Sequence, residues 1–501
     1  MENASITTDV SRPVNAHDDE DDNGDDDKEA EMETAPPSDE PETKAQLSPT
    51  PTQRPWFVLP AIVLSQFAGT ALWFAGNAVL DDLVDEWGLP ESSLGVMTSS
   101  VQLGFIAGTL AFALYSVADR FLPTKVFLTC AVLGSVCNAI IPFLGWNVDE
   151  TDNDNDANES SSSSSSSSSN LLLTGLIVLR FATGFFLAGI YPVGMKVAAD
   201  HYQSGLGVAL GWLVGALALG SSFPFLLRQI PQPWQALLWE TSLIALLGGL
   251  TVGFIVPNGP YRKAGTKKFE PRALWTLFQN APFRSAAFAY WGHMWELYAF
   301  WTWCPVVWEA YLEEERDNHN NDVPDFWSES MVTFFVIAIG AVGCILGGYA
   351  SARYGSATVA FTALATSGSL CLLSPALYLA PFALALTAYL LWGMAVVADS
   401  PQFSTLVAQT APANNVGTAL TIVNCIGFAI TIGSIQLLGV PWSEKYLFLL
   451  LAPGPLFGLW SLRKLVFVPS RLENLAATSR SKGKATPLGG GEEESGKHNN
   501  S

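Results

Sequence analysis

The chain has 501 residues, of which 49% are apolar, yet its formal net charge is −21. This acidity, without any basic and aromatic-rich patch, excludes an electrostatic nucleic-acid binder. The charges lie mainly in the first 54 residues and in a few short intervals between long apolar runs. Apolar runs that are separated in this way from the charged segments predict an integral membrane protein.

The apolar runs have the length that a bilayer requires. A hydrocarbon core about 30 Å thick is crossed by about 20 helical residues. Runs of this size recur to the end of the apolar region and predict an all-α fold with about twelve transmembrane helices. The predicted spans are 56–80, 93–118, 124–146, 171–194, 205–227, 234–256, 283–311, 331–352, 357–379, 382–406, 416–438 and 446–468.

Charged and low-complexity segments divide these spans into two groups of six. We expect a disordered acidic tail, two six-helix halves separated by a basic linker, and a second disordered tail, because acidic, serine-rich and mixed polar segments cannot bury enough apolar surface to fold. The predicted segments are 1–54 (tail), 55–256 (first half, with a disordered acidic and polyserine outer loop at 147–170), 257–282 (linker), 283–468 (second half) and 469–501 (tail).

The basic residues of the loops predict the orientation of the chain. Arg120, Lys125, Lys196 and Arg353 all fall on one side of a twelve-span topology, and cytoplasmic loops are enriched in Lys and Arg. Both termini are therefore expected to be cytoplasmic, although the sequence does not identify the membrane. The sequon at Asn158 would lie on the opposite side, where its glycosylation tests the topology.

Two short motifs resemble those of the major facilitator superfamily over roughly residues 56–468. The loop after the second span is similar to the family pattern Gly-x-x-x-Asp-Arg-x-Gly-Arg-Arg/Lys, without its opening glycine and with a different middle. The eighth span ends in a partial second copy, and the fourth span matches Arg-x-x-x-Gly-x-x-x-Ala-Gly. The matching residues are Asp119, Arg120 and Lys125 in the first copy, Gly348, Arg353 and Gly355 in the second, and Arg180, Gly184, Ala188 and Gly189 in the fourth span.

This resemblance implies a fold of two six-helix pseudo-repeats with the solute site between them. It implies that the first, fourth, seventh and tenth helices surround a central cavity, and that the second, fifth, eighth and eleventh join the halves. It also makes the loop residues Asp119, Arg120, Lys125 and Arg353 a conformational gate. Glycines that share one helix face predict close packing at the junction of the halves; these are Gly104, Gly108, Gly207, Gly211, Gly215, Gly343 and Gly347.

Four charged or titratable residues fall inside the predicted spans: Arg180, His293, Glu296 and Asp399. Such groups are costly in lipid and normally face a cavity or a partner. His293 and Glu296 are three residues apart and share a helix face, so they could hold a proton jointly or bind a polar substrate group. The alternative is a structural pair. If the pair carries the coupling proton, Glu296→Gln should abolish pH-dependent uptake.

The other charges also leave alternatives open. The planar fork of Arg180 suits an anionic substrate, but it could equally form a structural ion pair with a neighbouring helix. Asp399 lies on a helix that Pro401 interrupts, which suits either a solute path or a cytoplasmic gate. Further cavity candidates are polar or aromatic, although core packing is an alternative for the two tryptophans; they are Gln66, Asn77, Tyr191, Trp291 and Trp295.

These observations predict a secondary transporter of a small solute, with an anionic substrate and proton coupling as options, that works by alternating access in a lipid bilayer. An uncoupled facilitator, or a membrane sensor with a transporter fold, are the alternatives. No phosphate-binding loop, metal-ligand cluster, paired catalytic carboxylates or Ser/His/Asp arrangement is recognised, and the six cysteines have no metal spacing. We therefore expect no enzymatic activity, no cofactor, no metal and no nucleic-acid partner, and a monomer.

Overall fold

The computed structural model describes residues 55–90, 92–145, 161–202, 206–262, 273–319, 323–324, 326–412 and 415–467. Contacts divide the chain into two units, residues 1–52 and 53–501, and all described residues belong to the second. The predicted acidic tail, the sequon at Asn158, the most basic part of the linker and the second tail lie outside the described residues.

The described residues form helices and no strand. The first group of helices comprises α1 (Val58–Thr70), α2 (Leu80–Trp87), α3 (Ser93–Leu114), α4 (Val117–Arg120), α5 (Pro123–Ile140), α7 (Ser161–Leu187), α8 (Tyr191–Ala199), α9 (Leu206–Leu227) and α10 (Trp234–Phe254). The second comprises α12 (Ala281–His319), α13 (Glu329–Tyr354), α14 (Ser356–Leu377), α15 (Phe382–Ala398), α16 (Ser400–Thr410), α17 (Val416–Leu438), α18 (Glu444–Leu447) and α19 (Pro453–Phe467). A short helix, α11 (Ala273–Gln279), lies in the linker.

Ten helical stretches in the described part of the chain are long and apolar enough to cross a membrane. The first and seventh predicted spans are not among the ten. The first is too short because α1 ends at Thr70, and the seventh, α12, is long enough but carries many Trp, Tyr, His and Glu residues along its middle, which lower its hydropathy. With these two helices, the all-α architecture with about twelve spans that the sequence predicts is confirmed.

Several spans predicted as single helices are interrupted. The first stops at Thr70, and its chain resumes helical form only at Asn77, in a short 3-10 turn before α2. The fourth breaks between α7 and α8, just before Pro192, and the tenth breaks at Asp399, just before Pro401. Proline cannot donate the backbone hydrogen bond that would continue the preceding helix. In a membrane, such backbone breaks are tolerated where protein or a cavity surrounds them.

Residues 161–170 of the segment expected to be a disordered loop (147–170) are helical, and residues 147–160 lie outside the described part of the chain. Helix α7 begins at Ser161 and continues without interruption into the fourth span. Serine is a modest helix former, but extending an existing helix fixes only one further residue for each hydrogen bond gained. The hydroxyl of Ser169 also donates to the carbonyl of Trp87 at 2.9 Å, which ties this end of α7 to α2.

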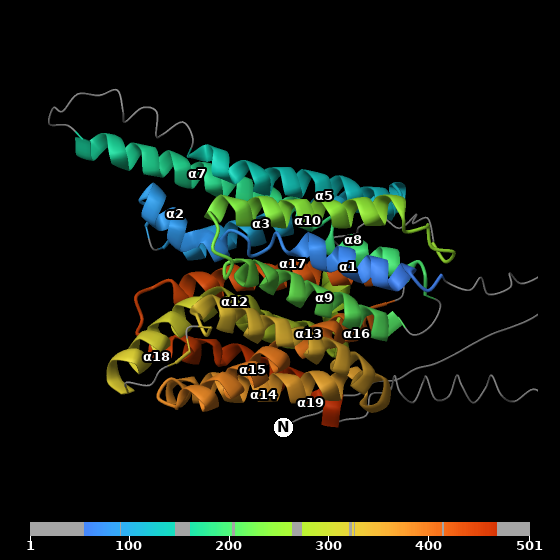
Figure 1. The fold of residues 1–501 in the computed structure, drawn as a ribbon. Helices are drawn as coiled ribbons and strands as arrows, with labels where there is room; N and C mark the ends of the chain where they lie inside the picture. Colours follow the sequence, from blue (N-terminus) through green and yellow to red (C-terminus); the bar gives the residue numbers. More distant parts are fainter. Residues whose placement is uncertain are drawn as a thin grey trace, which may run out of the picture. The chain divides into compact units, whose positions relative to one another are not determined.

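Equivalent pairs of helices pack together in the two groups. The second and fourth spans are in contact as α3 and α7, and the eighth and tenth as α13 and α15. The third and sixth pair as α5 and α10, and the ninth and twelfth as α14 and α19. Figure 1 shows α3, α5, α7 and α10 together and α13, α14, α15 and α19 together. This correspondence is what two six-helix pseudo-repeats require.

The two groups meet along α9 with α13 and along α3 with α17. A Cβ on Gly211 would lie 2.9 Å from the carbonyl oxygen of Cys344, so this glycine permits the close approach that was expected between the halves. Other glycines pack inside a half instead. Gly104 lies against α7 and Gly343 against α15, which corrects their expected place at the junction between the halves.

The two ends of the helices differ in charge. We term the end that carries Arg120, Lys196 and Arg353 the basic end, and the end that carries Asp82 and Glu86 the acidic end. At the acidic end Arg228 pairs with Asp82 at 2.9 Å, and the ring nitrogen of Trp234 donates to Glu86 at 2.6 Å.

Candidate functional site

A small cavity lies where the two groups of helices meet. Its volume is about 20 Å³, which is room for one water-sized sphere, so a larger solute requires the helices to move apart. Tyrosine, serine and asparagine side chains face it together with aliphatic ones. The lining residues are Tyr191, Val214, Leu217, Tyr290, Met294, Leu297, Tyr298, Val397, Ser400, Ser404, Asn424 and Phe428.

An aromatic cluster, termed here the aromatic plug, forms one wall of the cavity. The ring of Trp73 stacks on Tyr298 at 5.4 Å and on Phe428 at 5.8 Å, and Phe105 contacts Phe428 at 4.5 Å. One turn further along α12, Trp301 contacts Phe74 at 6.2 Å. These rings are buried and come from both groups of helices. The plug therefore joins the two groups of helices beside the cavity, which Tyr298 and Phe428 line.

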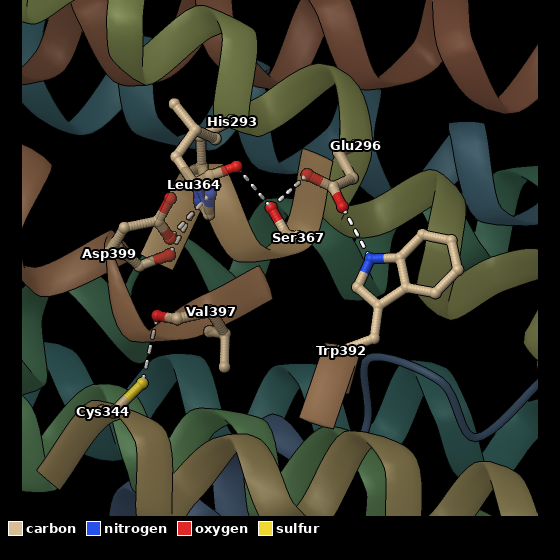
Figure 2. A network of polar contacts seen from close by, with 9 residues as sticks. His293, Glu296, Cys344, Leu364, Ser367, Trp392, Val397 and Asp399 are labelled. Atoms are coloured by element: carbon tan, nitrogen blue, oxygen red, sulfur yellow. Dashed lines mark hydrogen bonds and ion pairs between the residues drawn. The ribbon is translucent and has the colours of Figure 1, made fainter. Parts of the chain in front are cut away.

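Asp399, His293 and Ser400 form a chain of contacts that ends at the cavity. Nδ1 of His293 lies 2.9 Å from Oδ1 of Asp399, and Nε2 of the same ring lies 2.8 Å from Oγ of Ser400. Both His293 and Asp399 are fully buried, whereas Ser400 lines the cavity. Figure 2 shows the ring of His293 facing the carboxylate of Asp399. The carboxylate can stabilise an imidazolium and fix the orientation of the ring.

This arrangement corrects two expectations. The partner of His293 is Asp399 and not Glu296, because the break before α16 brings Asp399 to the ring. The structure also contains a Ser/His/Asp arrangement, which was not recognised in the sequence. In hydrolases with such triads, a backbone N–H beside the nucleophile commonly helps to bind the oxyanion. The residue that follows Ser400 is Pro401, which has no N–H, so the geometry suits proton transfer better than acyl transfer.

Glu296 points away from the cavity into the second group of helices. Its Oε1 accepts from Nε1 of Trp392 at 2.7 Å and from the thiol of Cys371 at 3.3 Å, and its Oε2 accepts from Ser367 at 2.9 Å. Figure 2 shows Glu296 joined to Ser367 and to Trp392. Its donors come from α14 and α15, so Glu296 joins three helices of this group.

Arg180 also lies outside the cavity, and both of its terminal nitrogens donate hydrogen bonds, whereas its Nε has no partner among the described residues. One terminal nitrogen donates to the carbonyl oxygen of Leu72 at 3.0 Å and to Oδ1 of Asn138 at 3.3 Å, and the other donates to the carbonyl oxygen of Trp73. These carbonyls belong to the interrupted part of the first span, where the helix leaves them without intrahelical donors. Arg180 therefore holds this segment in place, and with it Trp73 of the plug.

The remaining candidates are divided between the cavity and the packed interior. Tyr191 lines the cavity. Asn77 donates to Thr98 at 2.7 Å, and Gln66 is buried beside Gly194. The ring nitrogens of the two tryptophans donate to backbone carbonyls, from Trp291 to Val423 at 3.0 Å and from Trp295 to Leu450 at 3.3 Å. Trp291 and Trp295 therefore pack between helices and do not line the cavity.

Sequence reasoning missed most residues that line the cavity. Tyr290, Met294 and Tyr298 are spaced four apart on α12, as are Ser400 and Ser404 on α16, and residues with this spacing share a helix face. A polar stripe within an apolar span was therefore a usable signal. Asn424, whose Oδ1 accepts from the hydroxyl of Tyr290 at 2.8 Å, had no such signal.

The predicted gate loop forms contacts at the basic end. Asp119 pairs with Lys196 at 2.7 Å, and Lys125 donates to the carbonyl of Gly253 at 2.9 Å. Arg120 and Arg353 are exposed. Just beyond α8, burial raises the pKa of Asp200, and the nearby Lys196 and Arg262 partly offset this effect. Asp119 thus joins the loop after the second span to the fourth span, and Lys125 joins the third span to the sixth.

The sequence and the fold of the chain were compared with those of known proteins. A family model described as Major Facilitator Superfamily matches residues 61–434. Among solved structures, the MFS proton:xylose symporter XylE bound to 6-bromo-6-deoxy-D-glucose is similar, with a TM-score of 0.60 and 15% identity. The match covers 83% of this chain and 99% of that chain, and at this identity it concerns the fold alone. No curated protein matches the sequence.

Proposed function

The chain belongs to the major facilitator superfamily, and from that premise we propose that this secondary transporter couples the movement of a small uncharged solute to that of a proton. The solute would bind in the cavity between the two groups of helices. Access would alternate as these groups rock about the site. The excess of Lys and Arg at the basic end supports a cytoplasmic location for that end.

The observation that carries the proposal is the buried pair of His293 and Asp399 behind the cavity wall. The two side chains are 2.9 Å apart, and among the described residues no Lys or Arg contacts either of them. Histidine is a common proton carrier in proteins, and a neighbouring carboxylate stabilises its charged form. An ionisable group in this position is a functional candidate by default, because burying it in the membrane is costly.

The lining of the cavity favours an uncharged solute over an anion. It offers hydroxyl and amide groups and no charged side chain. The cation considered for anion binding, Arg180, donates instead to two backbone carbonyls and to Asn138. An anion entering the cavity would lose its hydration without gaining a cationic partner, which costs several kcal/mol.

Uptake into vesicles that contain the purified protein tests this proposal. The panel pairs uncharged solutes with their acids, such as xylitol with xylonate and glycerol with glycerate. Xylose is included because the structurally similar symporter is named for it. We expect an uncharged member to accumulate only when a proton gradient is imposed, and we expect no accumulation of its acid.

Two variants assign the coupling to the buried pair. His293→Gln and Asp399→Asn should each abolish accumulation, while His201→Gln serves as the control because the ring of His201 bonds to the backbone of Val197 at the basic end, outside the cavity lining. Equal uptake with and without the gradient would favour the uncoupled facilitator. Binding of a solute without any flux would favour the sensor. Accumulation of an acid without accumulation of its uncharged partner would favour the alternative of an anionic substrate.

A further inference from the structure

Ser400 is the member of the Asp399–His293–Ser400 chain that touches the cavity. Its Oγ lies 2.8 Å from Nε2 of His293, and the same side chain lines the cavity. His293 and Asp399 are themselves fully buried. A solute in the cavity therefore meets the hydroxyl of Ser400 and not the imidazole ring.

The contacts assign the hydrogen positions of the neutral ring. Nδ1 lies 2.9 Å from Oδ1 of Asp399, although the two atoms are not aligned as a hydrogen bond. A lone pair on Nδ1 would repel the carboxylate at this distance, so the neutral ring carries its hydrogen on Nδ1. Nε2 then carries a lone pair and accepts from the hydroxyl of Ser400. In this state the single hydroxyl hydrogen is engaged, and Ser400 offers the cavity only acceptor lone pairs.

Protonation of the ring reverses this relationship. The imidazolium has N–H groups on both nitrogens, so Nε2 becomes a donor to Oγ of Ser400. The hydroxyl hydrogen is then released and can rotate toward the cavity. The same serine offers an acceptor when His293 is neutral and a donor when it is charged.

We infer that Ser400 transmits the protonation state of His293 to the solute, and that the coupled solute presents a hydrogen-bond acceptor to this hydroxyl. Such a solute binds more tightly to the protonated protein, and by linkage it increases proton binding by the same factor. This inference rests on the proposed function, because it specifies how the buried pair and the cavity communicate. It also restricts the coupling contact to a carbonyl or ether oxygen of the solute, because a hydroxyl could donate to Ser400 when His293 is neutral.

Other titratable groups near the pair must be considered in any pH profile. Glu296, one turn along α12, and Cys344 on α13 interact electrostatically with Asp399. Tyr290, which faces His293 on α12 with ring centroids 5.9 Å apart, interacts with Tyr191 on α8 and Cys425 on α17. None of these groups separates His293 from Ser400, so substitutions at Ser400 isolate the proposed step.

The first test needs no solute. Nitrogen-15 NMR on the purified, histidine-labelled full chain reports which ring nitrogen carries hydrogen, and the His293→Gln spectrum identifies the signal among the five histidines of the sequence. We expect hydrogen on Nδ1 of the neutral ring, and an Nε2 shift that changes in Ser400→Ala. The control Ser434→Ala, whose buried hydroxyl bonds to its own helix, should leave the signal unchanged. Hydrogen on Nε2 of the neutral ring, or no response to Ser400→Ala, would overturn the inference.

The second test uses the uncharged solute that the vesicle panel selects. The ratio of uptake with the proton gradient to uptake without it should fall at least tenfold in Ser400→Ala. Ser400→Thr, which keeps a hydroxyl, should retain the wild-type ratio. Coupling that survives in Ser400→Ala at the wild-type level would refute the inference and leave the proposed function intact. If the wild-type protein transports no solute of the panel, the proposed function fails. The NMR result alone then decides whether Ser400 responds to the protonation state of His293.

Discussion

Glu296 and Asp399 are both fully buried carboxylates, but their surroundings give them different tasks. Glu296 accepts hydrogen bonds from Trp392, Ser367 and Cys371, which are donors from neighbouring helices. Asp399 instead faces His293, a group that can itself take up a proton. A carboxylate that accepts several donors stabilises the packing of its helices, whereas one beside an imidazole can respond to pH.

We predict that the role of Glu296 is structural. Glu296→Ala removes the acceptor of the Trp392 N–H and of the Ser367 hydroxyl, and leaving buried donors unpaired costs about 1–3 kcal/mol. Glu296→Gln keeps an acceptor for Trp392 and should cost less. Thermal unfolding in detergent measures both changes, and uptake by Glu296→Gln should keep its dependence on pH. Loss of that dependence at unchanged stability would return the coupling role to Glu296.

A second prediction concerns Arg180. Arg180→Lys keeps the charge but loses the fork that reaches the carbonyls of Leu72 and Trp73, so stability should fall by about 2 kcal/mol. Arg228→Lys is the matched control, because Arg228 forms a partly exposed ion pair with Asp82 and such pairs contribute about 0–1 kcal/mol. Thermal unfolding compares the two variants. If Arg180→Lys preserves stability and raises only the KM of an anionic solute, Arg180 belongs to the binding site.

At this scale the sequence predicts which residues are unusual but not which ones meet. Arg180, His293, Glu296 and Asp399 are identified because charge is rare in apolar spans. Helix periodicity then pairs His293 with Glu296, since it assumes unbroken helices. The contact with Asp399 depends on where two helices cross and where one of them is interrupted, and that information is not local in the sequence.

At the scale of helices, small residues determine how closely the backbones approach. A Cβ on Gly184 would lie 2.1 Å from the carbonyl oxygen of Val101, and one on Gly393 would also meet the backbone of a neighbouring helix, at Val336. These two glycines bring α7 against α3 and α15 against α13, the equivalent pairs of the two halves. These two close approaches lie inside the halves, whereas the one at Gly211 lies between them.

We predict that Gly184→Ala destabilises the protein by about 1–3 kcal/mol, because the backbone it meets cannot move aside without separating the helices. Gly433→Ala on α17 is the control, since a Cβ there meets no atom within 4 Å. Thermal unfolding of both variants in detergent measures the difference. Equal stability of the two variants would mean that α3 and α7 are less closely packed than described.

The number and order of the helices follow from the apolar runs, because a membrane requires helices of a minimum length. The interruptions are harder to predict. Pro192 and Pro401 signal two of them, but the break after Thr70 contains no proline, and its free carbonyls depend on Arg180 from another helix. The helix over residues 161–170 differs from the expectation drawn from composition, because a helix that is already formed can extend into a segment that would not form one alone.

At the scale of the whole molecule, contacts between the halves decide which end of the cavity is closed. The aromatic plug joins Trp73 to Tyr298 and Phe428, and nearer the acidic end Gln436 donates to the hydroxyl of Ser99 at 2.8 Å. At the same end Gln229 donates to Ser328, which also caps α13 by accepting from the N–H of Met331. Alternating access requires all of these contacts to break and re-form in each cycle.

The most direct measurement of this requirement links the halves chemically. Cysteines introduced at Ser99 and Gln436, joined by a short cleavable thiol linker, should stop solute uptake into vesicles, and reduction should restore it. The matched control links positions 232 and 240, where Gln232 and Glu240 are 3.0 Å apart within one half, and should leave uptake unchanged. Uptake at the full rate while positions 99 and 436 remain linked would contradict transport by alternating access.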